Sequence, residues 1–144
     1  MTLNPEELLT AAPRGLDAEL GVVIESVDPD EIVAAIELQP KHHQPFGIVH
    51  GGVYCAFAES VASVSAFVWL HHTGIGGTAV GVNNNTDFLR SVSAGKITAR
   101  SVPIHRGRRQ QLWAVEMTDA DGRIIARSQV RLQNIELPAP EAAR

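Results

Sequence analysis

The sequence contains a single cysteine in 144 residues, which excludes an intrachain disulfide. It also lacks an excess of basic residues: 16 acidic and 12 basic side chains give a net charge of −4, so nothing favours nucleic-acid binding. Residues 1–7 include neither a basic nor an apolar stretch, so we expect no signal peptide and a cytoplasmic protein. With 44% hydrophobic residues, the chain can form one globular domain with a substantial core.

Motifs for metal and cofactor chemistry are also missing. The pairs His42-His43 and His71-His72 have no cysteine or acid at metal-ligand spacing, and we expect them on surface loops. The Gly-Ile-Gly-Gly segment at residues 74–77 precedes a predicted strand, whereas a dinucleotide fingerprint opens a helix. No serine or cysteine occurs in a nucleophile-elbow context. We therefore expect an activity that needs no metal and no bound cofactor.

The most prominent feature that is present is a mainly apolar stretch of 20 residues, 51–70. It predicts one long helix of about 30 Å. No proline interrupts it, and the glycines of residues 74–77 would end it. A stretch of this length could cross a membrane. However, three serines and Glu59 lie within it and the remaining chain is polar, so we expect a buried core helix and no membrane association.

The predicted helix has two unlike faces. At 100° per residue, its bulky side chains lie opposite Glu59 and suit packing beneath a sheet: Val53, Phe57, Val61, Val64 and Val68. The residues that flank Glu59 are all small: Gly52, Cys55, Ala56, Ala62, Ser63 and Ala66. This smooth face would let a second helix or a ligand approach closely. A buried carboxylate there would need a partner, and Glu59 could be structural as well as catalytic.

Gly51 and Gly52 stand at the start of this helix, where backbone N–H groups are unpaired and the helix dipole favours negative charge. They could polarise a carbonyl oxygen, although a glycine pair can also form only a tight turn. Gly52 and Glu59 lie about 10 Å apart along one helix, and a base must come within about 3 Å of its target. One carbonyl cannot meet both groups of the same helix. We therefore infer a homodimer with two antiparallel helices and active sites at the interface.

The rest of the chain reads mainly as β-sheet. A short helix is expected over residues 5–12, and apolar or alternating runs predict strands at residues 20–27, 31–38, 77–89, 96–105, 110–118 and 123–135. The connections after the long helix are short, so the sheet should be antiparallel. We thus predict an α+β fold with six antiparallel strands around one helix. Its parts are a helical segment at residues 1–18, a main domain at 19–136 and a flexible tail at 137–144.

The segment Gln44-Pro45-Phe46-Gly47-Ile48-Val49-His50-Gly51-Gly52, followed by Glu59, resembles the hotdog-fold acyl-CoA thioesterases of the phenylacetate-degradation and 4-hydroxybenzoyl-CoA type. The resemblance covers about residues 20–135. It implies a hotdog fold, an acyl-CoA or aroyl-CoA substrate, and a homodimer with shared active sites, usually paired into a tetramer. The Gln/Glu pair is more similar to the 4-hydroxybenzoyl-CoA branch.

The resemblance also implies roles for individual residues. Glu59 would be the nucleophile or the general base, and Gly51, with Gly52 beside it, would polarise the thioester carbonyl. Gln44 would position water or the acid, His50 would order the loop, and the hydroxyl of Ser63 would assist.

Coenzyme A needs phosphate partners, and arginine suits phosphate through its two-pronged guanidinium. Arg106, Arg108 and Arg109 share one predicted turn, and Arg90 follows a predicted strand. Without the resemblance this turn would read as a solvated one. With it, the four arginines become candidate phosphate contacts, and the segment Val82, Asn83 and Asn84 a candidate lining for the pantetheine or acyl channel. The asparagines could equally form a bulge.

Two other functions are open to the sequence. A hotdog hydratase or dehydratase would use a histidine and an acid in other motifs, which we do not find. A non-catalytic acyl-CoA-binding module would keep the arginines and the pocket without needing Glu59. The sequence does not identify the acyl group.

Overall fold

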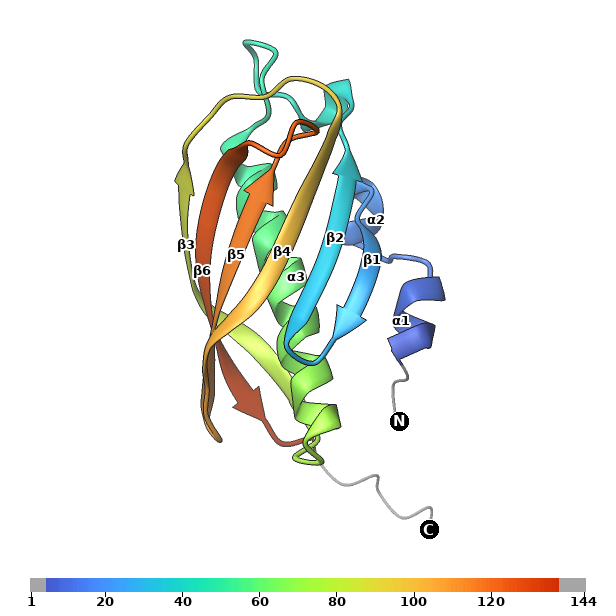
Figure 1. Cartoon of the computed structure of the whole chain (residues 1–144), viewed down its shortest axis with the longest axis vertical. Helices are drawn as coiled ribbons and strands as arrows, with labels where there is room; N and C mark the ends of the chain where they lie inside the picture. Colours follow the sequence, from blue (N-terminus) through green and yellow to red (C-terminus); the bar gives the residue numbers. More distant parts are fainter. Residues whose placement is uncertain (1–4, 138–144) are drawn as a thin grey trace.

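The structure, a computed structural model, describes residues 5–137 of the chain (Figure 1). The helices are α1 (Pro5–Thr10), α2 (Leu16–Leu20) and α3 (Gly51–His72), with a short 3-10 helix at Pro40–His42. The strands are β1 (Val23–Asp28), β2 (Glu31–Glu37), β3 (Thr78–Phe88), β4 (Lys96–Arg106), β5 (Gln110–Thr118) and β6 (Ile124–Ile135). The predicted tail at residues 137–144 lies, apart from Leu137, outside the described residues.

The six strands form one antiparallel sheet in the order β1-β2-β4-β5-β6-β3, and this sheet wraps around α3 (Figure 1). Burial alternates along β5, where Gln111, Trp113, Val115 and Met117 point into the core, as expected for a strand with one buried face. The predicted α+β class, with six antiparallel strands around one long helix, is confirmed. This is the hotdog fold.

The strand order leaves β3 at one edge of the sheet because β3 pairs with the last strand, β6, and not with β4. A bulge interrupts this pairing between Gly81 and Asn83, so Val82 has no partner opposite it. The edge carries exposed apolar side chains, with Val80 at 43% and Val82 at 52% exposure. Such an edge can pair with another strand.

Helix α3 is asymmetric as predicted, but its open face is narrower than the sequence indicates. Val53, Phe57, Val61 and Val68 are buried, and Val64 is partly buried. Ala62 and Ala66, which were expected beside Glu59 on the smooth face, are fully buried in the core because the sheet curves far around the helix. We call the partly or fully exposed residues on the Glu59 side of α3 the open strip; its members are Gly52, Cys55, Ala56, Glu59, Ser60, Ser63 and Phe67.

The length and composition of α3 would suffice to cross a membrane, but 56% of the apolar window is buried inside the fold. This is the pattern of a core helix in a globular protein. The helix runs to His72, two residues further than predicted, before glycines with positive φ end it.

The N-terminal region contains two short helices where the sequence predicted one. The helix expected over residues 5–12 ends at Thr10, and α2 follows after Pro13 and Gly15. Gly21, with φ of 75°, ends α2, so β1 starts only at Val23. The predicted boundary between residues 18 and 19 therefore falls inside α2.

The loop before α3 is fixed by a buried histidine. His42 is only 2% exposed: its Nδ1 accepts a hydrogen bond from the Gln39 N–H (2.9 Å), and its Nε2 lies 2.8 Å from the Leu20 carbonyl oxygen. The expectation that His42 lies on the surface is wrong. The loop folds back onto the end of α2, and its position sets where α3 begins.

Candidate active site

Glu59 lies halfway along the open strip, and one amide orients its carboxylate. Asn84, on β3, donates from Nδ2 to the Glu59 Oε2 (3.1 Å) and to the Cys55 carbonyl oxygen (2.9 Å). Thr86 donates to the Asn84 Oδ1 (2.7 Å), so the amide must turn its NH₂ group towards Glu59. Asn84 was predicted to line a channel; in the structure its amide holds the acid.

Gly81 lies against the same carboxylate. A Cβ atom added at Gly81 would overlap the Glu59 carboxylate. Any residue other than glycine would therefore displace the carboxylate from its observed position. Gly81 is not among the site residues predicted from the sequence. Its only signal in the sequence is a glycine inside a predicted strand, which often marks a bulge or a close approach.

The carboxylate of Glu59 is partly exposed in the single chain, not deeply buried as the sequence analysis supposed. Within residues 5–137 it forms no ion pair, and its one side-chain partner is the Asn84 amide. An acid that is oriented by a hydrogen bond but not paired with a cation remains able to take a proton or attack a carbon. Ser63 lies one turn further on the same strip.

Counting partners among the described residues, the start of α3 presents one backbone donor without a hydrogen bond. His50 is the N-cap residue, and its Nδ1 accepts a hydrogen bond from the Gly52 N–H at 2.8 Å. The Gly52 N–H is therefore occupied. The Gly51 N–H has no hydrogen-bond partner among the described residues. Of the two donors predicted for a carbonyl oxygen, only Gly51 is without a partner in residues 5–137.

A cavity of about 320 Å³ lies beside this donor. Its lining includes Gln44, Ile48, Gly51, Tyr54, Phe88 and Arg90. The Gln44 Oε1 accepts from the Phe46 N–H and so shapes the loop. The Phe88 ring covers Gly51 so closely that an added Cβ would come within 2.8 Å of it. The cavity thus brings together the free donor, the predicted Gln44 and the predicted Arg90.

Tyr54 is a buried polar residue in this region. Its hydroxyl has no hydrogen-bond partner in the described part of the chain, and its ring lies 6.0 Å from that of Phe88, centroid to centroid. Burial raises the pKa of Tyr54 above its ordinary value of 10.0, so the phenol remains protonated.

The four predicted arginines do not share one site. Arg90 lies at the start of α3, whereas Arg108 and Arg109 line grooves near its end, beside Ile75 and Gln133. Arg106 turns inward: its Nη1 donates to the Asp30 Oδ1 (2.6 Å) and to the Pro29 carbonyl oxygen (3.1 Å).

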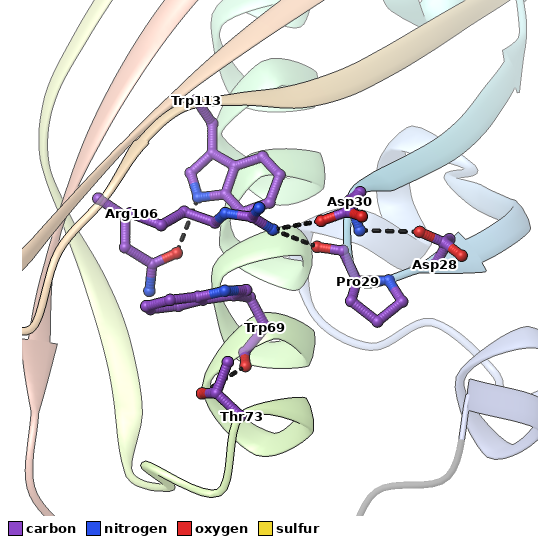
Figure 2. A network of polar contacts seen from close by, with 8 residues as sticks. Asp28, Pro29, Asp30, Trp69, Thr73, Arg106 and Trp113 are labelled. Atoms are coloured by element: carbon purple, nitrogen blue, oxygen red, sulfur yellow. Dashed lines mark hydrogen bonds and ion pairs between the residues drawn. The ribbon is translucent and has the colours of Figure 1, made fainter.

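The guanidinium of Arg106 also lies between two indole rings. Its Cζ is 5.6 Å from the ring centroid of Trp69 and 5.8 Å from that of Trp113 (Figure 2). These contacts place Arg106 in the packing of the fold and leave Arg108 and Arg109 as the exposed basic pair of this hairpin. Val82 and Asn83 are exposed on the β3 edge, next to the open strip.

Within the described residues, no three His, Cys, Asp or Glu side chains are placed to hold a metal ion.

Comparison with known proteins identifies the family of this chain. Residues 46–126, more than half of the chain, match the model of the Thioesterase superfamily. The chain belongs to the Thioesterase superfamily. Membership of this superfamily, with relatives named esterase and thioesterase, indicates a hydrolase.

Two relatives span nearly the whole chain. The Mycobacterium tuberculosis protein named "Putative esterase Rv1847" is 52% identical over 92% of this chain and 94% of its own. Its solved structure has a TM-score of 0.82 and covers 86% of this chain and 98% of that one. The structure of thioesterase HI1161 from Haemophilus influenzae is 32% identical, has a TM-score of 0.86, and covers 99% of this chain and 97% of that one.

Proposed function

We propose that this superfamily member hydrolyses acyl-CoA or aroyl-CoA thioesters at sites that two copies of the chain share. The observation that carries the proposal is a pair of complementary half-sites on α3. Glu59 supplies an oriented, unneutralised carboxylate, and Gly51 supplies a backbone N–H without a partner in the described chain.

The two half-sites cannot serve one substrate within one chain. Eight residues separate Gly51 from Glu59, which is about 12 Å at 1.5 Å per residue. In an antiparallel pair of α3 helices, the start of each would lie beside the middle of the other. The small side chains of the open strip allow such an approach, and the unpaired β3 edge beside it offers a second contact between the copies.

In this arrangement the thioester oxygen accepts a hydrogen bond from Gly51 of one copy, and Glu59 of the other copy acts on the carbonyl carbon. As a general base, Glu59 takes a proton from water while the water oxygen bonds to carbon; the C–S bond then breaks and the leaving thiolate takes that proton from the Glu59 carboxyl group. As a nucleophile, Glu59 displaces the thiolate and forms an anhydride, which water hydrolyses to the acid and free Glu59. Gly51 stabilises the oxyanion in both cases.

The remaining predicted residues have supporting roles. His50 keeps the Gly52 N–H occupied and fixes the helix start, and Gln44 and Ser63 would position water or the acid. With Gly51 of one copy beside Glu59 of the other, the end of the second helix lies about 20 Å further along, so Arg90 of one copy and Arg108 and Arg109 of the other could contact different parts of one extended coenzyme A. We further propose a dimer of dimers in the cytoplasm that needs no metal or cofactor.

The test is release of free thiol from a panel of CoA esters. We expect hydrolysis by the wild type and a loss of about 10²–10⁴ in rate for Glu59→Gln. Glu37→Gln, the same change on an exposed residue at the end of β2, is the matched control and should keep full activity. Equal rates for Glu59→Gln and wild type would reject the catalytic assignment. Binding of CoA esters without turnover by the wild type would instead favour a non-catalytic binding module.

A further inference from the structure

A second cavity, of about 230 Å³, lies on the other flank of α3. The α1 helix and the segment after it form its roof, β1 and β2 form its wall, and α3 forms its floor; Figure 1 shows α1 and α2 beside the β1 edge. Its lining includes Leu8, Val22, Ile32, Ala34, Val61 and Val64. These side chains are aliphatic, so the cavity suits an apolar group.

The floor of this cavity adjoins the proposed catalytic acid. Ser60, which lines the cavity, follows Glu59 in the chain, and Val64 lies one turn further along the helix. Ser63 lies between Glu59 and Ser60 in direction around the helix, at about 100° per residue. All of these side chains are partly exposed. An acyl group whose carbonyl carbon meets Glu59 can therefore pass over Ser63 into the cavity.

The polar groups of the lining are Asp17 and Ser60, which bond to each other. The Ser60 hydroxyl donates to the Asp17 Oδ1 at 2.5 Å. This bond gives the Ser60 hydroxyl an acceptor. The Asp17 carboxylate remains at the rim of the cavity and forms no ion pair in the described chain. A second carboxylate brought in by a substrate would meet like charge and lose water, both of which are unfavourable.

We infer that this cavity is the acyl subsite, and that it selects uncharged acyl groups of moderate size over acetyl and over acyl groups that end in a carboxylate. The inference rests on the proposed thioesterase function and deepens it. About seven or eight groups the size of a water molecule, at roughly 30 Å³ each, fill 230 Å³. This corresponds to an aryl ring or a chain of about six to eight carbons.

The test is a profile of kcat/KM over acetyl-, hexanoyl-, octanoyl-, benzoyl- and succinyl-CoA. We expect the wild type to prefer the six- to eight-carbon and benzoyl esters over acetyl- and succinyl-CoA by at least tenfold. Val64→Phe fills the floor of the cavity and should reduce hexanoyl and octanoyl turnover by about 10- to 200-fold, the range for apolar pockets. Acetyl turnover should change less than twofold.

Val33→Phe is the matched control. Val33 lies on β2 between the lining residues Ile32 and Ala34, so alternation points it to the outer face of the sheet. It should keep the wild-type profile. Size-exclusion chromatography of both variants should show the wild-type oligomer, which excludes a defect in assembly.

The outcomes separate two failures. If the wild type hydrolyses CoA esters but Val64→Phe lowers all of them equally or changes none, the cavity is not the acyl subsite and the proposed function stands. A wild-type preference for acetyl- or succinyl-CoA also overturns the inference. If the wild type hydrolyses no thioester, the proposed function itself fails.

Discussion

The two halves of α3 differ in what their polar groups contact. The first half, Gly51 to Glu59, holds a backbone donor with no partner in the described chain and a carboxylate with one amide partner. Near the end of the second half lies Trp69, where Arg106 fills the space between two indole rings and reaches Asp30 on the β1–β2 turn (Figure 2). In the described chain, the Gly51 N–H and the Glu59 carboxylate keep hydrogen-bonding capacity open, whereas the Arg106 guanidinium is held by contacts within one chain.

This difference separates function from stability along one helix. A polar group without a partner costs stability when it is buried, so a fold retains one mainly where a ligand or a second chain completes it. The contacts of Arg106 instead join α3, β4 and the β1–β2 turn within one chain. We therefore expect changes to the Gly51 donor or the Glu59 carboxylate to alter turnover at constant stability, and changes to the Arg106 contacts to do the reverse.

After the loss expected for Glu59→Gln, the largest effect comes from removing the Gly51 donor. Gly51→Pro deletes the N–H, and proline suits the first position of a helix; His50 has φ −65° and ψ 132°, which a following proline accepts. We expect a loss of about 10²–10³ in kcat, as for other oxyanion donors.

Gly51→Ala is the control for this change, since it adds a Cβ beside Phe88 but keeps the donor. Its loss should be much smaller. Similar losses in kcat for the two variants would mean that crowding against Phe88, and not the N–H, limits turnover.

The next effect is on folding. Arg106→Ala removes the ion pair with Asp30 and both indole contacts. We expect the free energy of unfolding in denaturant titrations to fall by about 2 kcal/mol, from contacts worth roughly 0.5–1 kcal/mol each plus a charged hydrogen bond. Arg108→Ala, on the same hairpin, should leave stability unchanged. An unchanged unfolding midpoint for Arg106→Ala would show that the Arg106 contacts contribute nothing.

A smaller effect is expected on KM. Arg108→Ala combined with Arg109→Ala should raise KM for CoA esters about five- to tenfold, if each exposed contact to a phosphate contributes up to ~1 kcal/mol. The KM for truncated pantetheine esters should not change. Arg127→Ala, on β6 and paired with Glu116, is the control for loss of positive charge. Equal KM changes for both classes of ester would argue against phosphate contact.

The smallest effect concerns a carboxylate in neither half. Burial alone would raise the pKa of Asp119, but hydrogen bonds from the Arg123 N–H, the Arg123 guanidinium and the Asp121 N–H lower it below its ordinary 3.8. Its contribution to stability is then complete above pH 3.8 and is lost as the pH falls through the lowered pKa. Asp119→Asn should therefore unfold more readily than wild type at neutral pH, and the difference should vanish in acid. A difference independent of pH would contradict this.

Much of the fold is readable from the sequence because its signals are local. An apolar stretch with a bulky and a small face predicts α3, and alternation predicts the strands around it. The side-chain directions on α3 follow from its period, but how far the sheet curves does not. Ala62 and Ala66 were therefore placed on the open face and lie in the core.

The candidate site is readable only in part. Glu59, Gly51 and His50 follow from one continuous segment. The bond from Asn84 to Glu59 joins residues 25 apart through a bulge, and the burial of His42 depends on a loop that returns to Leu20. Neither contact leaves a periodic signal in the sequence. The occupation of the Gly52 N–H by His50 likewise requires the structure.

The central claim is that Glu59 of one chain acts with Gly51 of another. It is tested by mixing two inactive variants, Glu59→Gln and Gly51→Pro, by refolding or co-expression. A mixed dimer carries both defects in one site and none in the other, so the mixture should regain thioesterase activity, up to half of the wild-type rate per mixed dimer. A mixture as inactive as the separate variants, with mixed dimers demonstrated, would contradict the shared site.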